Sequence, residues 1–221
     1  MLIGLLALAC AGVSGISSQE PRGRESSAPD PDRHYLRSVV FRGLGDTFLI
    51  HWEKHKMPLR VYLPPPPPGL FENPRAIRQA VELGVLNWTN VAGPGLPRFE
   101  FVDNIGDADI PILWAEEPDG DWYIAFCSYD VNTRTMRMGV SHILVTGRWG
   151  GGRVAGIEEI YQTVLHEMGH ALGLGGHSPD SRDIMYYSMS GSAVGLSDAD
   201  KLTLKKLYQY GSRRYSGRRS R

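Results

Sequence analysis

The sequence has few of the features that would assign it to several common classes of protein. Only two of its 221 residues are cysteines, Cys10 and Cys127, so we expect no internal disulfide. Its 24 basic and 24 acidic side chains cancel, which leaves no long-range field to favour nucleic acid as a partner. No apolar run is long enough to cross a bilayer. With 42% apolar residues, the composition suits one compact domain, which we expect to be a monomer.

The N-terminal residues differ in composition from the rest of the chain. Residues 2–13 are apolar and end in small residues, so we expect residues 1–16 to be a secretory signal peptide, although no Lys or Arg precedes the run. This predicts a secreted or cell-envelope protein. A lipid-anchored form through Cys10 is the weaker alternative. Residues 17–34 are rich in Ser, Pro, Glu, Asp and Arg, which predicts a flexible linker or short propeptide.

Residues 35–211 carry the pattern of one α+β domain. Strands are expected at residues 59–63, 99–102, 109–114, 123–129 and 138–145, and helices at residues 74–91, 157–173 and 196–210. Asn73 before Pro74 is an N-cap signal for the first helix, and Ser197 is one for the third. Residues 212–221 contain five arginines and are expected to form a basic disordered tail.

The second expected helix contains an HExxH motif formed by His166, Glu167 and His170. Four helical residues turn by about 400°, so both histidines project from one face, one turn apart. That spacing lets both imidazoles bind one zinc ion. Glu167, about 100° around the helix from His166, would stand beside the metal and accept a proton from water. Two unrelated histidines can share this spacing by chance, so the motif needs a third ligand.

A third ligand is available in the segment that follows the motif. No glutamate follows Glu167, which excludes the zincins whose third ligand is a distant glutamate. His177 is the only later histidine. The glycines that precede it can end the helix and turn the chain back towards the metal.

The stretch HEMGHALGLGGHS at residues 166–178 resembles the HExxHxxGxxH signature of the metzincins, and within them of the matrixin (matrix metalloproteinase) catalytic domain. It has one residue more before the last histidine. The usual ligand position falls on Gly176, which has no side chain, so we expect His177 to bind instead. Related zincins can use an aspartate as third ligand, and Asp180 and Asp183 are therefore the alternatives.

Two further positions carry the resemblance past the third histidine. Ile184-Met185-Tyr186 is similar to the family's Met-turn, which implies that Met185 packs beneath the zinc histidines. Tyr187 stands where some metzincins have a tyrosine that approaches zinc, so its expected role is either transition-state stabilisation or ordinary packing. The resemblance covers about residues 57–210 and implies a zincin-like domain with a twisted mixed sheet of about five strands and three helices.

The resemblance implies a secreted zinc-dependent endopeptidase that binds a peptide antiparallel to an edge strand near residues 125–127. A second, structural zinc is unsupported because Asp119 and Asp121 have no histidine near them, and calcium there stays an open alternative without support. No propeptide cysteine is available to keep the enzyme latent. The competing hypothesis is an inactive zinc-binding scaffold or binding protein, against which the intact Glu167 counts.

Overall fold

The computed structural model describes residues 5–9, 32–43, 46–91, 93–115, 124–132, 134–149, 152–188, 191–211 and 213–214. Cys10, Asp119 and Asp121 lie outside these residues, as do most of the expected linker and tail. The lipid anchor at Cys10 and the calcium ion at Asp119 and Asp121 therefore remain alternatives that rest on the sequence.

The main sheet is mixed, as the sequence predicted. Its strands are β1 (Leu5–Ala9), β4 (Leu59–Tyr62), β5 (Phe99–Val102), β6 (Ile110–Trp114), β7 (Ala125–Asn132) and β8 (Arg137–Val145), in the order β1-β7-β8-β6-β4-β5. Strands β5, β4, β6 and β8 run parallel, whereas β7 is antiparallel to β8. All five strands expected in the domain are present, which confirms the α+β class.

Strand β1 was not expected, because it falls in the predicted signal peptide. Its backbone pairs antiparallel with the outer edge of β7, from Leu5 opposite Asn132 to Ala9 opposite Ser128. A second, three-stranded sheet of β2 (Phe41–Gly43), β3 (Asp46–Leu49) and β9 (Arg213–Arg214) was also not expected. Strands of two to four residues are too short to show an alternating apolar pattern.

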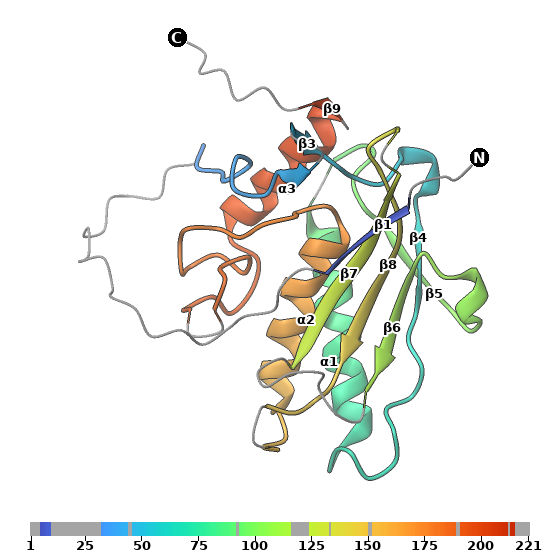
Figure 1. The fold of residues 1–221 in the computed structure, drawn as a ribbon. Helices are drawn as coiled ribbons and strands as arrows, with labels where there is room; N and C mark the ends of the chain where they lie inside the picture. The colour runs from blue at the N-terminus through green and yellow to red at the C-terminus, as the bar shows by residue number, and fades with distance from the viewer. Residues whose placement is uncertain are drawn as a thin grey trace.

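Three α-helices complete the domain: α1 (Pro74–Leu86), α2 (Ile157–Ala171) and α3 (Asp198–Tyr210). Short 3₁₀ turns occur at Lys54–Lys56, Asn87–Asn90 and Ile105–Asp107. Helices α1 and α2 lie side by side against one face of the main sheet (Figure 1). Gly84 permits their close approach, because a Cβ there would lie 3.0 Å from Val164 Cγ1. None of the described helices is long and apolar enough to cross a membrane.

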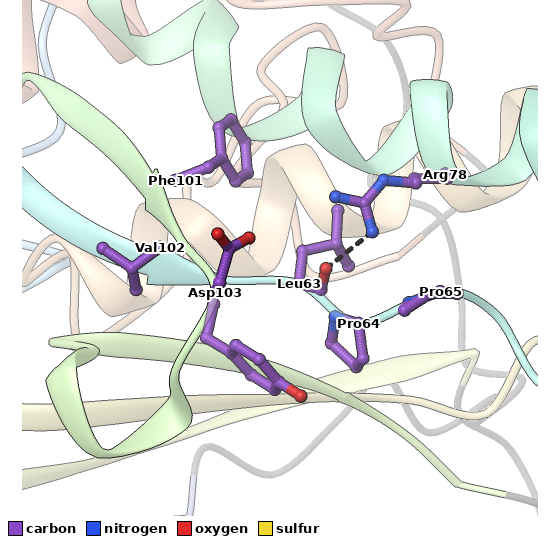
Figure 2. Close-up of a pocket in the computed structure, with 8 residues that line it drawn as sticks. Leu63, Pro64, Pro65, Arg78, Phe101, Val102 and Asp103 are labelled. Carbon is purple, nitrogen blue, oxygen red and sulfur yellow. Dashed lines mark hydrogen bonds between the residues drawn. The ribbon is translucent and has the colours of Figure 1, made fainter.

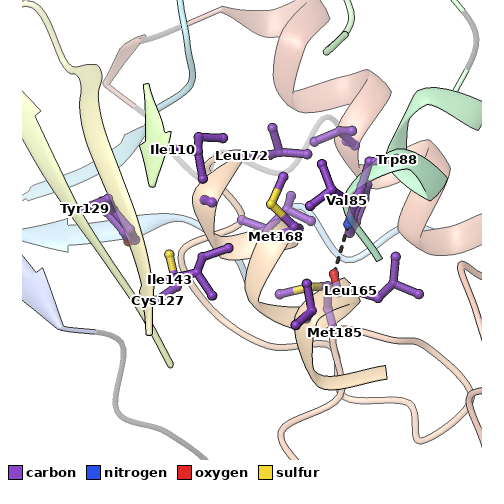
Figure 3. Packing of buried hydrophobic residues seen from close by; sticks show 14 of the residues in the cluster. Val85, Trp88, Ile110, Cys127, Tyr129, Ile143, Leu165, Met168, Leu172 and Met185 are labelled. Carbon is purple, nitrogen blue, oxygen red and sulfur yellow. Dashed lines mark hydrogen bonds between the residues drawn. The ribbon is translucent and has the colours of Figure 1, made fainter. Parts of the chain in front are cut away.

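Helix α2 is buried for most of its length, which places its motif inside the domain. Figure 3 shows Leu165 and Met168 packed among core side chains contributed by α1, the following 3₁₀ turn and the sheet. Trp88 is fully buried and its Nε1 donates to the carbonyl oxygen of Leu165 at 2.9 Å. The HExxH motif therefore lies on a helix that the core contacts on several sides.

Candidate metal centre

The structure brings three histidines together. His166 and His170 project from α2, and His177 reaches them from the loop that follows; the three ring centroids are 4.9 to 5.3 Å apart. One ring nitrogen from each lies within 4.8 Å of the other two. His166 and His170 are buried and His177 is half-buried. Within the described part of the chain, no fourth histidine, cysteine, aspartate or glutamate joins this group.

The turn between the helix and His177 depends on closely packed glycines. Gly173 has a φ of 106°, a left-handed conformation that follows the last turn of α2, and a Cβ there would lie 2.3 Å from the carbonyl oxygen of Ile50. At Gly176 a Cβ would lie 2.1 Å from the carbonyl oxygen of Ser38. Gly175 donates its amide to the carbonyl oxygen of Val39 at 3.0 Å. The glycines therefore let the loop press against residues 38–39 on its way to His177.

Hydrogen bonds fix which nitrogen of each helical histidine is available to a metal. Nδ1 of His166 lies 2.7 Å from the carbonyl oxygen of Ile184, and Nδ1 of His170 lies 2.6 Å from that of Leu174. A carbonyl oxygen can only accept, so Nδ1 carries the proton and donates. In the neutral rings Nε2 then holds a lone pair, which is the arrangement that metal-binding histidines have.

Burial favours the neutral form of His166 and His177. It lowers the pKa of His166 well below its usual value, and the charge of neighbouring His170 acts in the same direction. Burial, with His170 again contributing, lowers the pKa of His177 to about 4. Both rings are therefore neutral near pH 7 and can offer lone pairs. A buried group of neutral, lone-pair nitrogens fits a cation such as zinc.

The two aspartates considered as alternative ligands have other partners. Asp183 is fully buried, and its carboxylate accepts hydrogen bonds from both terminal nitrogens of Arg33, at 2.8 and 2.5 Å. Asp180 accepts from Arg33 at 3.0 Å and from Arg182 at 2.7 Å. Neither carboxylate belongs to the histidine group.

Met185 lies beneath the helix that carries the motif, and Figure 3 shows it beside Leu165. It is completely buried, and a Cβ on Gly169 would lie only 2.2 Å from its sulfur. Gly169, between the two histidines, therefore leaves the space that Met185 occupies. The backbone here is also held, because the amide of Ser178 donates to the carbonyl oxygen of Met185 at 2.7 Å.

The remaining two site candidates differ in burial. Glu167 is only 4% exposed and follows His166 directly on α2. Tyr187 is 51% exposed, and its ring centroid lies 4.5 Å from that of Tyr186. Glu167 is thus buried within α2, whereas Tyr187 lies exposed on the loop after Met185.

The edge expected to receive a peptide is the outer side of β7. On its inner side β7 pairs with β8, from Ala125 opposite Val145 to Cys127 opposite Ile143. On its outer side β7 pairs with β1 from Asn132 to Ser128.

A cavity lies near β5, at the edge of the main sheet opposite to β7 and β1. The cavity has a volume of about 370 Å³ and lies at the ends of β4 and β5. Figure 2 shows the residues that line it, with the hydrogen bond from Arg78 to Leu63. Nη1 of Arg78 donates to the carbonyl oxygen of Leu63 at 2.6 Å. The other residues that line the cavity include Phe101 and Asp103. It shares no residue with the histidine group.

A mixed sheet backed by a helix that carries HExxH, with a third histidine folded back onto it, defines a metzincin-type metalloprotease domain. Residues 51–209 match the family of matrixin peptidases, and this range covers more than half of the chain. The chain therefore belongs to the matrixins, a family of zinc metalloproteases, which are hydrolases that act on peptides. A comparison with curated protein sequences gives no match.

Several residues that support the site were not identified from the sequence. They are Arg33, the paired partner of Asp183, and Asp200, which accepts from the amide of Ile184 at 3.0 Å. The main-chain acceptors at Leu174 and Ile184 were also missed. A buried aspartate in the first turn of α3 was the one local signal that could have pointed to Asp200, since N-terminal carboxylates commonly accept from nearby amides.

Proposed function

We propose that this matrixin is an active zinc-dependent endopeptidase in which His166, His170 and His177 hold the metal and Glu167 is the general base. The observation that carries the proposal is the set of three converging histidines with no fourth protein ligand among the described residues. Structural zinc sites have four protein ligands, whereas catalytic sites have three and an open position. The buried Glu167 beside them supplies the base that a hydrolytic site needs.

When bound there, zinc would polarise the scissile carbonyl and make water more acidic. Glu167 then accepts a proton from the attacking water and transfers it to the leaving amine as the C–N bond breaks, so that the carboxylate is regenerated. The burial of Glu167 excludes bulk water from this transfer. His166 and His170 keep their lone pairs directed into the site through the hydrogen bonds of their Nδ1 atoms.

We propose that the substrate lies extended and antiparallel to β7 along residues 125–127. Main-chain hydrogen bonds between an edge strand and an extended peptide do not depend on the sequence of the peptide, so side-chain pockets would set the selectivity. Tyr187 lies two residues past Met185 and half-exposed, where a substrate can meet it. If its hydroxyl stabilises the transition state, Tyr187→Phe lowers kcat while KM stays constant; with packing alone, both constants stay at their wild-type values.

We further propose that the protein is exported, with residues 1–16 as signal peptide and residues 35–211 as the catalytic domain. The support is the apolar run at residues 2–13. N-terminal sequencing of the protein recovered from the medium of expressing cells tests this proposal. A mature protein that begins at residue 1 would contradict it.

The decisive test of function is Glu167→Gln, assayed with a quenched peptide library with and without a chelator. We expect turnover to fall about 10²–10⁴-fold, the usual contribution of a general base, while zinc stays bound at one equivalent. Glu158→Gln is the matched control, because Glu158 is an exposed residue of the same helix that contacts Gln162. An active Glu167→Gln protein would exclude Glu167 as the base.

The competing function is an inactive zinc-binding scaffold. It predicts that the wild-type chain binds one zinc and cleaves no peptide in the library. Cleavage that requires both zinc and Glu167 excludes the scaffold.

A further inference from the structure

An ion pair between the partly exposed Arg33 and the buried Asp183 links the start of the domain to the loop that carries the third histidine. Asp183 has no exposed surface, and a carboxylate buried in this way is costly unless charges and hydrogen bonds compensate it. Arg33 supplies the charge: its Nη1 and Nη2 donate to the two carboxylate oxygens at 2.8 and 2.5 Å. These residues are 150 positions apart in the sequence.

Two serine hydroxyl groups also donate to Asp183, and one of them is adjacent to the third histidine. The Ser178 hydroxyl donates to Oδ2 at 2.5 Å, and Ser178 directly follows His177. The Ser197 hydroxyl donates to Oδ1 at 2.7 Å. Together with Arg33, these contacts give Asp183 four donors, which satisfies both oxygens of the buried carboxylate.

Asp183 is also adjacent in sequence to Ile184, whose carbonyl oxygen accepts from Nδ1 of His166. The same carboxylate is thus one residue from the acceptor that orients His166 and one hydrogen bond from the residue beside His177. If the guanidinium were removed, the buried charge would lose its compensation, and the 178–184 loop would have to shift or admit water. Both changes would reach the histidines.

We propose that Arg33 is a positioning residue of the metal centre: through Asp183 it holds the loop that places His177 and orients His166. The residues just before the expected catalytic domain therefore form part of the framework of the site. This inference rests on the proposed role of the three histidines as zinc ligands.

The test compares zinc affinity in three full-length variants by competition with a chromophoric chelator. Arg33→Gln is expected to raise the zinc dissociation constant about 10–100-fold, the range seen when outer partners of metal ligands are removed. Arg33→Lys should raise it less, because a single ammonium keeps the charge but cannot match both oxygens. Arg182→Gln is the matched control: it removes an exposed arginine whose side chain donates its hydrogen bonds to Asp180 and not to Asp183, so zinc affinity should not change.

Two further readouts separate positioning from simple stabilisation. The melting temperature of the metal-free variants reports stability alone, and the visible spectrum of the Co²⁺-substituted proteins reports ligand geometry. A changed cobalt spectrum in Arg33→Gln, but not in Arg182→Gln, is expected. If Arg33→Gln keeps the wild-type zinc affinity and cobalt spectrum, whatever its melting temperature, the proposal is overturned.

If Arg33→Gln does not fold, Arg33→Lys decides, and wild-type affinity in that variant overturns the proposal. Failure of the proposed function looks different: a wild-type chain that binds zinc but cleaves no peptide contradicts the endopeptidase and leaves the role of Arg33 open to the same test, whereas a wild-type chain that binds no zinc contradicts both. Zinc bound normally by the wild type and by Arg33→Gln contradicts the role of Arg33 alone.

Discussion

The two halves of the metal centre are built in different ways. His166 and His170 stand on α2, where helical geometry sets their spacing and buried neighbours hold the backbone. His177 stands on a loop whose course depends on distant partners: the carbonyl oxygen of Val39, the backbone of Ser38 and the Arg33–Asp183 pair. The comparison shows that a metal site can combine one locally determined half with one half determined by tertiary contacts.

The largest expected effect distinguishes the two halves through their histidines. His170→Ala and His177→Ala should each abolish tight zinc binding, because each removes a proposed ligand. Only His170→Ala should also destabilise the metal-free fold, by about 2 kcal/mol or more, since it opens a buried gap and leaves the carbonyl oxygen of Leu174 without its donor. Urea denaturation of the metal-free proteins measures this difference, and equal destabilisation would contradict the comparison.

A smaller effect is expected when a side chain fills the space that Gly169 leaves for Met185. Alanine normally stabilises a helix by about 1 kcal/mol relative to glycine. At Gly169 the clash with the sulfur of Met185 should outweigh this gain and destabilise the fold by roughly 1–3 kcal/mol. Gly195→Ala is the control, because its Cβ would meet only the Tyr161 hydroxyl at 3.8 Å. An unchanged or raised denaturation midpoint for Gly169→Ala would show that Met185 moves aside easily.

Loss of a hydrogen bond at the C-terminal end of α2 should lower the unfolding free energy less than Gly169→Ala does. Tyr208 on α3 is buried, and its hydroxyl donates to the carbonyl oxygen of Leu172 at 3.2 Å, just past the last residue of α2. Tyr208→Phe removes this hydroxyl, which also has a hydrogen bond with the backbone of Trp52. We expect a loss of about 0.5–1.5 kcal/mol in unfolding free energy and little change in zinc affinity. A large loss of zinc affinity would mean that the end of the helix is less independent than the comparison states.

The smallest effect concerns the first turn of α2. Hydrogen bonding from Arg153, with further donors at the Gly156 amide and Trp149, lowers the pKa of Glu159 to about 2 from its usual 4.5. A carboxylate with a lowered pKa in the folded state contributes stability above pH 4.5 and loses it as the pH falls towards 2. The difference in melting temperature between wild type and Glu159→Gln should therefore be small near neutral pH and shrink over that interval. A difference independent of pH would argue against the ion pair.

The parts of the fold that could be predicted from the sequence are those that local spacing determines, as in the helical half of the metal centre. The spacing of apolar residues predicted α2 to within two residues of its observed end, and Ser197 was correctly expected to cap α3. The first helix was predicted to continue to residue 91, whereas it ends at Leu86 and continues as a 3₁₀ turn. Asn87 accounts for part of this change, because its side chain donates to the carbonyl oxygen of Leu83 at the helix end.

The site was predictable where chemistry is encoded by local spacing. The HExxH motif and the later histidine were evident in the sequence, and the structure brings all three rings together. Asp183 shows where this reasoning ends: a single aspartate after the motif is equally consistent with a metal ligand and with an ion pair. Its partner Arg33 lies 150 residues away, and no periodicity connects positions so distant.

The acceptors for His166 and His170 are both main-chain carbonyl groups, at Ile184 and Leu174. Unlike a carboxylate partner, a carbonyl persists whatever amino acid occupies the position. Point mutation at either residue therefore cannot delete the hydrogen bond directly, and random variation in the gene has few routes to changing the tautomer of these rings. A substitution can therefore alter these hydrogen bonds only indirectly, by changing the path of the loop, as Arg33→Gln is expected to do at Ile184.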